Sequence, residues 1–267
     1  MEMVSLGLEV PQGLAKEIAS REDAFYYLER ILHDEKYWYQ GGPGDAWTPY
    51  HAIHILPLIK TNDALELLLD TMKDKRDALG GWITESTPTL LAAFGESAIE
   101  RLTEYVLNET LDLYVRGSVA TALNVIAHQY PDRKDDIKSF ISNLLENTND
   151  QTFAAFLIDE LLSFKDPNLL PQVGKAFGDG RIDTEVISRD DIDWVFNLPE
   201  EEQSYSKFMK DPLEHFSKEK INYLRTISYP ESKTPMKAKK IGRNDPSYIP
   251  QVYFENESFS ITSNDAD

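Results

Sequence analysis

Two histidines near the start of the chain have a spacing that could support metal chemistry. His51 and His54 lie three residues apart in TPYHAIHILPLIK, so they share one side of the helix that this stretch predicts. Two imidazoles could hold a metal ion if a nearby carboxylate added a third ligand, and a metal-dependent hydrolase could use such a site. The Glu of an HExxH motif is missing, and packing beside Tyr50 explains the same pair. We therefore expect no metal site, and keep the hydrolase as an alternative.

A second group of residues could bind a partner protein. Trp38, Trp47 and Tyr50 flank the Gly-rich loop in KYWYQGGPGDAWTPYH. Large aromatic side chains dominate the binding energy of protein interfaces, and the loops of helical-repeat proteins gather on one face. Packing of the N-terminal end of the fold is the competing interpretation. These three residues are the partner-binding candidates in the main part of the chain.

Motifs of the common enzyme classes are missing from the sequence. No GxSxG, GxxxxGK[ST] or Rossmann pattern occurs, so acyl transfer, P-loop hydrolysis and dinucleotide redox chemistry have no motif support. The 267 residues include no cysteine, which excludes thiolate nucleophiles, disulfides and Cys-based zinc sites. We expect no catalytic residues and no cofactor, and we predict a non-catalytic scaffold or adaptor that binds another protein.

The charge of the chain narrows the choice of partner. Lys and Arg number 27 against 46 Asp and Glu, which gives a formal charge of −19. The electrostatic field of such an acidic chain repels nucleic acid and anionic membranes and favours a basic protein partner. The N-terminus MEMVSLGLEVPQGL lacks the features of a signal peptide, and apolar runs long enough to span a membrane are missing. These patterns predict a soluble cytoplasmic protein without membrane contact.

Apolar residues recur with a helical period and fall into pairs of segments. The second segment of each pair begins near Asn62, Glu96, Arg133 and Pro167, so the unit repeats every 34 to 37 residues. That interval lies within the range of two-helix solenoids, in which no unit buries its apolar face alone. The pattern predicts an all-α solenoid over residues 20–180 and a helical C-terminal cap, within a body of residues 1–230.

Local signals also predict individual helix ends. Ser20 with Asp23 and Ser188 with Asp191 have the spacing of a capping box, in which two side chains satisfy free backbone groups at a helix start. Pro57 lies within a predicted helix and removes the bond to the carbonyl of Ile53, which favours a bend.

Two stretches resemble known families. VRGSVATAL, with Val115, Arg116, Ala120 and Ala122, resembles the first helix of HEAT and armadillo-type repeats, which implies that Arg116 bonds a neighbouring repeat. KKIGRNDP at 239–246 resembles the first half of the SEC-C tail, a zinc-binding module of bacterial proteins, but the cysteines that hold the zinc are absent. HEAT-like helical pairs that end in such a tail resemble an uncharacterised bacterial family.

The end of the chain differs in composition from the body. Residues 231–246 read as a basic linker and turn, and QVYFENESFSIT within 247–267 predicts a small hairpin-like or mobile tail. Within it, residues 233–243 have five basic side chains and no acid, and the partner-contact candidates among them are Lys237, Lys239, Lys240 and Arg243. Opposite charge predicts that this tail docks on the acidic body, and contact with RNA or the ribosome is an alternative.

Overall fold

The computed structural model describes residues 2–228, and over this range all regular secondary structure is helical. The predicted all-α class is therefore confirmed for these residues, which contain no β-strand. The linker at 231–246 and the hairpin-like tail at 247–267 lie outside them. None of the helices in this part of the chain is both long and apolar enough to cross a membrane. The α-helices are α1 Glu2–Ser5, α2 Gln12–Ala19, α3 Ala24–His33, α4 Trp47–Ile59, α5 Asn62–Asp74, α6 Arg76–Leu79, α7 Trp82–Glu85, α8 Thr87–Ala92, α9 Ile99–Val106, α10 Leu113–Gln129, α11 Lys134–Asn147, α12 Gln151–Leu162, α13 Leu170–Gly178, α14 Arg189–Asn197 and α15 Lys218–Ser228.

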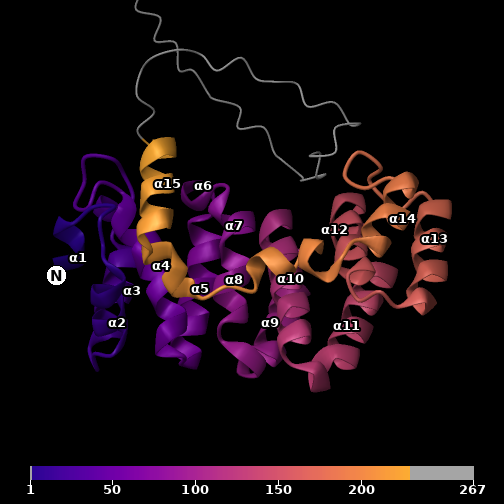
Figure 1. The fold of residues 1–267 in the computed structure, drawn as a ribbon, viewed down its shortest axis with the longest axis horizontal. Coiled ribbons are helices and arrows are strands. Elements are labelled where there is room, and N and C mark those ends of the chain that lie inside the picture. The colour runs from indigo at the N-terminus through magenta and orange to yellow at the C-terminus, as the bar shows by residue number, and fades with distance from the viewer. Residues whose placement is uncertain (1, 229–267) are drawn as a thin grey trace, which may run out of the picture. The chain divides into compact units, whose positions relative to one another are not determined.

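The expected pairs of helices are present at the predicted positions. α5 begins at Asn62, and three 3-10 turns, Gly95–Ala98, Pro131–Arg133 and Pro167–Leu169, lead into α9, α11 and α13. The long helix α10 packs against α8, α9, α11 and α12, so each pair closes its apolar face against its neighbours (Figure 1). This packing replaces the water that the apolar stripes would otherwise contact.

Helices α4, α8, α10 and α12, called here the inner helices, differ from the outer helices α5, α9 and α11. In α11 the buried residues Ile137, Ile141 and Leu145 follow one stripe, as the sequence predicted. In α10 the buried residues include Val115, but they run around the whole helix. A helix that is apolar on all sides must be covered on all sides. The outer helices cover one side of the inner helices, and residues 199–216 cover another.

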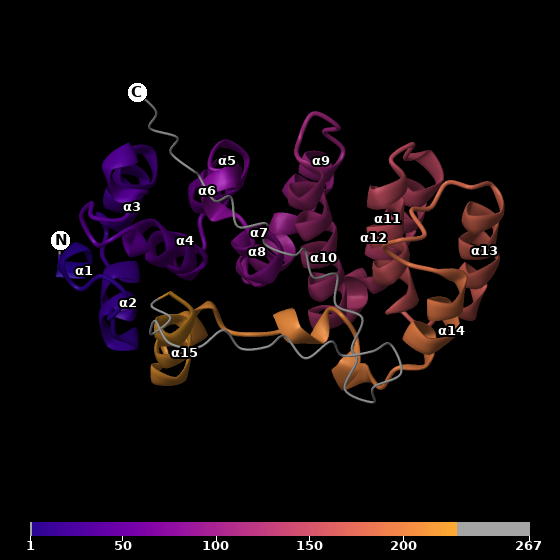
Figure 2. The same ribbon diagram turned by 90° about the horizontal axis from the view of Figure 1, so that it is seen from above.

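The covering element is the C-terminal segment, defined here as residues 199–216. It runs back along the inner helices on the side opposite α5 and α9 (Figure 2). Thr89 Oγ1 donates to the carbonyl of Phe208 (3.1 Å), and Gln12 Nε2 donates to the carbonyl of Leu213 (3.2 Å). Its apolar anchors are all buried: Tyr205, Phe208, Leu213 and Phe216. The last part of the described chain thus consists of α14, this segment of 3-10 turns, and α15, and it returns to the N-terminal helices α2 and α4.

One predicted capping box is present and the other is wrong. The backbone N–H of Ser188 donates to Asp191 Oδ2 (2.8 Å) at the start of α14. Ser20 instead ends α2, where its N–H donates to the carbonyls of Lys16 and Glu17. Because α3 begins only at Ala24, Asp23 is left to pair with Arg21.

Arg116 of α10 contacts the two neighbouring helices α9 and α12. Its Nε donates to the carbonyl of Val106 at the end of α9 (3.0 Å), and its guanidinium lies 4.0 Å from the ring centre of Phe153 in α12. The side chain is only 6% exposed, and burial lowers its pKa. Its contacts therefore serve helix packing.

A buried carboxyl group links α10 to α12. Glu160 accepts hydrogen bonds from Thr121 Oγ1 and from Asn124 Nδ2, which also donates to Ser163 Oγ (2.8 Å). Burial, together with the neighbouring carboxyl of Asp159, raises the pKa of Glu160 to about 7. Within residues 2–228, Asn124 Oδ1 is buried and has no hydrogen-bond partner.

We expect Glu160→Gln and Glu160→Ala to have opposite effects at pH 8. Because the folded state holds the Glu160 proton more tightly than the unfolded state, its stabilising effect is present at low pH and is lost as pH rises through about 7. Glutamine carries no charge, and its side-chain oxygen can accept from Asn124 Nδ2 while its nitrogen donates to Thr121 Oγ1, so it should be neutral or stabilising. Alanine should lower the free energy of unfolding by about 2–4 kcal/mol, because it leaves a cavity and removes one buried acceptor each from Thr121 and Asn124. Urea unfolding at pH 6 and 8 measures both, and equal effects would contradict the buried, protonated carboxyl.

Candidate functional site

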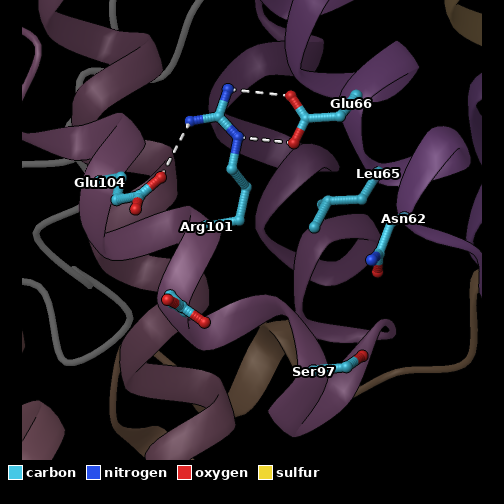
Figure 3. A pocket seen from close by; sticks show the side chains of 7 residues that line it. Asn62, Leu65, Glu66, Ser97, Arg101 and Glu104 are labelled. Carbon is cyan, nitrogen blue, oxygen red and sulfur yellow. Dashed lines mark hydrogen bonds and ion pairs between the residues drawn. The ribbon is translucent and has the colours of Figure 1, made fainter.

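Two hollows lie next to each other between the outer helices α5, α9 and α11. The first has a volume of about 300 Å³ and opens between α5 and α9 (Figure 3). The second has a volume of about 310 Å³ and opens between α9 and α11. We call them groove 1 and groove 2, and Glu100 lines both. The other lining residues are Asn62, Leu65, Glu66, Ser97, Arg101 and Glu104 in groove 1, and Glu96, Ile99, Arg133, Asp136 and Ile137 in groove 2.

The amphipathic character of the outer helices places these side chains. In α9 the buried residues Leu102 and Val106 face the inner helices. The helical period then turns Glu100, Arg101 and Glu104 to the edges of the helix, where the grooves lie.

An ion pair crosses groove 1 from α9 to α5. Arg101 Nε donates to Glu66 Oε1 (2.5 Å) and its NH2 donates to Oε2 (2.9 Å), so the guanidinium binds the carboxylate with two parallel bonds. A third nitrogen, NH1, lies 3.8 Å from Glu104 Oε2 (Figure 3). The hydrogen bonds to Glu66 raise the pKa of Arg101. The Glu66 carboxylate is therefore engaged, whereas Glu104 has only a weak pair.

Acidic groups outnumber basic groups around both grooves. Arg133 NH2 lies 3.8 Å from Glu96 Oε2, a long and exposed pair. Among the described residues, Glu100 and Asp136 have no ion pair within 4.0 Å. Five carboxylates and two guanidinium groups line the two grooves, a formal balance of −3.

The two grooves combine apolar and charged surface. Leu65 and Ile137 are 3% and 2% exposed and belong to the hydrophobic core, and Ile99 packs against that core. Of the three, only Ile99 is partly exposed, so it gives groove 2 some apolar surface, whereas groove 1 is lined mainly by polar and charged groups. A Lys or Arg side chain has the matching chemistry, because its aliphatic stem can lie on apolar surface while its charged head reaches carboxylates.

The predicted aromatic candidates lie together at another place. Trp38 Nε1 donates to the carbonyl of Leu32 (2.9 Å), and Tyr50 Oη donates to the carbonyl of Ala78 (2.7 Å). Trp38, Trp47 and Tyr50 are partly buried, and their rings contact one another at centroid distances of 5.9–6.3 Å. Their hydrogen bonds and ring contacts join neighbouring elements, which corresponds to the packing interpretation.

His51 and His54 meet a third histidine, His215 of the C-terminal segment. His51 Nε2 donates to the carbonyl of Gly7 (2.8 Å), so its Nδ1 is the acceptor for His215 Nε2 (3.0 Å). His54 Nδ1 donates to the carbonyl of Tyr50 (2.7 Å), and its ring stacks on that of His215 at a centroid distance of 3.7 Å. In the described part of the chain, no three His, Asp or Glu side chains are arranged to hold a metal ion.

A family model described as "Protein of unknown function (DUF1186)" matches residues 14–228. The chain belongs to this family. No curated protein and no solved structure matched the sequence. The DUF1186 match covers both grooves and the three histidines, whereas Lys237, Lys239, Lys240 and Arg243 lie beyond it and outside the described residues.

The groove residues of this family member were not among the sequence candidates. A signal for them exists, because Glu66, Glu100 and Asp136 are 34 and 36 residues apart and so recur with the period of the helical pairs. An acid at one position of successive repeats becomes a row of acids once the repeats pack side by side. Aligning the repeats with one another would have revealed this row.

Proposed function

We propose that the protein is a non-catalytic, cytoplasmic scaffold that binds a basic segment of another protein at grooves 1 and 2. The observation that carries the proposal is the pair of adjacent grooves in which carboxylates outnumber guanidinium groups by five to two. Glu100 and Asp136 have no internal ion pair among residues 2–228, so their charge is available to a ligand. The whole chain carries −19 charges, which would attract a basic partner over a longer range.

The position of the C-terminal segment favours the grooves over the inner helices as the binding surface. Helical-repeat proteins commonly bind partners along an extended face. Here the anchors contact the inner helices: Tyr205 stacks on His128 of α10, the carbonyl of Phe208 accepts from Thr89 of α8, and Phe216 lies against His51 of α4. The outer helices carry no such cover from this segment, and both grooves lie between them.

We further propose that the helical pairs form a HEAT-like solenoid. The interval of 34 to 37 residues and the contacts of Arg116 with α9 and α12 support this arrangement. In such an array each step repeats the same groove with different side chains. A partner with basic side chains at intervals could then fill successive grooves.

Single exposed ion pairs contribute little, so the binding energy must come from several contacts. An exposed pair contributes about 0–1 kcal/mol and weakens as salt rises. Two or three basic side chains would then supply at most about 3 kcal/mol through their ion pairs, and a micromolar dissociation constant needs about 8 kcal/mol, so we expect weak binding with a dissociation constant nearer the millimolar range. Reversible, salt-sensitive binding is the expected behaviour.

We expect Glu100→Lys to weaken the binding of a Lys-rich peptide about tenfold, because it places a positive charge in both grooves. The probe is a fluorescent peptide with lysines in a Gly/Ser background, titrated into the full chain at 50 mM and 500 mM salt. Glu22→Lys is the matched control, since Glu22 is exposed, lies outside the grooves and gives the same change in net charge. We expect the control to change affinity less than twofold.

Equal losses in Glu100→Lys and Glu22→Lys would overturn the proposal, because they would indicate diffuse attraction to the acidic chain. A single-stranded RNA oligonucleotide of equal length serves as a second probe. Tighter binding of the RNA than of the peptide would also overturn it, in favour of an RNA-associated role.

A further inference from the structure

We propose that the inner helices hold a second protein-binding surface, and that residues 203–208 of the C-terminal segment, called here the internal ligand, occupy it. A partner that displaces the internal ligand should have the same chemistry, a basic residue between two aromatic anchors. This inference goes beyond the proposed function, because it concerns the inner helices and not grooves 1 and 2. It follows from how the internal ligand contacts α10 and α12, and from the polar atoms that this contact leaves unpaired.

The internal ligand lies on the inner helices as a short bound peptide would. It makes backbone hydrogen bonds within itself, since the N–H of Phe208 donates to the carbonyl of Tyr205 (2.9 Å). Its side chains make most of the contact with the helices. The ring of Tyr205 stacks on that of His128 in α10 at a centroid distance of 3.6 Å, and both aromatic anchors are buried. A segment held in this way can be exchanged for a peptide of like chemistry while the helices keep their own hydrogen bonds.

The basic residue of the internal ligand acts on two carboxyl groups without pairing with either. Asp159 and Glu160 are neighbours on α12, and the charge of Lys207 favours the ionised form of both. Lys207 is exposed, forms no ion pair among the described residues, and places its ammonium 4.9 Å from the ring centre of Phe208. A partner whose Lys or Arg reaches these carboxyls would gain an ion pair that the internal ligand does not make.

Buried polar atoms at this contact are also left unpaired. In the described part of the chain, Asn124 Oδ1, His128 Nε2 and Gln203 Oε1 are buried and have no hydrogen-bond partner. Asn124 and His128 lie one turn apart on the same side of α10, so both stay on the surface when the internal ligand leaves. A buried polar atom without a partner costs free energy. A partner that hydrogen-bonds to these atoms therefore has the advantage over the internal ligand that displacement requires.

The test supplies the internal ligand as a separate peptide. The probe is a fluorescent peptide with blocked ends and the sequence of residues 201–210, EEQSYSKFMK, titrated into the full chain. Its two acids and two lysines give no net charge, so attraction to the acidic chain contributes little. In the wild-type protein the tethered segment competes at a high effective concentration. Tyr205→Ala removes the stacked ring of this competitor, and we expect the probe to bind that variant at least tenfold tighter than the wild type.

Two variants control for the substitution and for folding. Tyr223→Ala makes the same change at an exposed position on α15 and should bind the probe no better than the wild type. Tyr205→Leu keeps apolar volume but loses the stack on His128, so it should show a smaller gain and replaces Tyr205→Ala if that variant does not fold. Circular dichroism shows whether each variant folds. A probe with serine in place of its Tyr and Phe should bind none of them.

A substitution on the body locates the surface. His128→Ala, added to Tyr205→Leu, removes the ring on which the Tyr of the probe would stack and should reverse the gain. Glu100→Lys changes both grooves and should leave binding of this probe unchanged, so the inference and the proposed function fail separately. Equal affinity for the wild type, Tyr205→Leu and Tyr223→Ala, or no binding to any of them, would overturn the inference.

Discussion

Replacing Phe216 by alanine is expected to lower the free energy of unfolding by about 3–5 kcal/mol, the range for a large buried aromatic residue. Phe216 is 2% exposed, and its ring lies 4.9 Å from that of His215 and 5.5 Å from that of His51. Removal of the ring leaves a cavity between the C-terminal segment and α4. The same substitution removes the last apolar anchor of this segment before α15.

Urea unfolding followed by circular dichroism measures this effect. Tyr223→Ala is the control, since Tyr223 is an aromatic residue of similar size that is 55% exposed on α15. We expect the control to change the free energy of unfolding by about 0.5 kcal/mol or less. Phe216→Leu should cost less than Phe216→Ala because it restores part of the lost volume. A change below about 1 kcal/mol for Phe216→Ala would show that the C-terminal segment adds little to stability.

The sequence predicted the helices best where the signals are local. The starts of α5 and α11 could be placed because an apolar stripe begins there, and in α5 Thr61 accepts from the N–H of Ala64. Ser188 and Asp191 are three residues apart in the sequence, so their capping box could also be predicted. The prediction for Ser20 was wrong because a serine can end one helix or start the next, and here it ends α2.

The course of the C-terminal segment could not be predicted, because its partners are distant in sequence. Gln12 and Leu213, which share a hydrogen bond, are 201 residues apart. The anchors Tyr205 and Phe208 lie in the stretch for which the sequence predicted a helical cap, and no local pattern indicates that they contact helices far away in the sequence. The sequence of α10 gives a partial signal, because a helix with apolar residues on all sides needs a second element to cover it. It does not identify which residues supply that cover.

The histidine cluster shows the same limit for candidate sites. The sequence placed His51 and His54 on one helix side but gave no reason to join them to His215, which comes 161 residues after His54. The ring of His215 stacks on His54 and hydrogen-bonds His51. A local pattern therefore predicted a pair, and tertiary packing made it a buried group of three neutral imidazoles.

This group leads to the second large effect, a loss of stability in mild acid. Burial lowers the pKa of His51 to about 4 and of His54 to about 3, and it lowers that of His215 well below its ordinary value. The positive charge of Lys220 also disfavours protonation of His54 and His215. In the unfolded chain each histidine titrates near 6.5, so the unfolded state binds more protons below that pH. The stabilising effect is complete above pH 6.5 and is lost as pH falls toward 4.

Each histidine should then destabilise the fold by about 2 kcal/mol at pH 5, since one pH unit below 6.5 corresponds to about 1.4 kcal/mol. Glu160 acts in the opposite direction between about pH 7 and 4.5, because its raised pKa stabilises the folded state in acid. His128 of α10, whose pKa burial lowers to about 4, adds to the loss. The net effect from pH 7 to pH 5 is expected to be a loss of a few kcal/mol.

The Glu160→Gln variant reduces the opposing effect, because it removes one of two buried carboxyls with raised pKa values and leaves Asp159. In this background the free energy of unfolding, from urea titrations at pH 7, 6 and 5, should fall steeply below pH 6. The slope should correspond to an unfolded state that binds about two to four more protons than the folded state. Adding His215→Gln should reduce the slope by about one proton, since glutamine can still donate to His51 Nδ1 but does not titrate. Acid would then release the C-terminal segment at its contact with α4. A free energy of unfolding that stays constant from pH 7 to 5 in the Glu160→Gln background would mean that the three imidazoles are not held neutral by the fold.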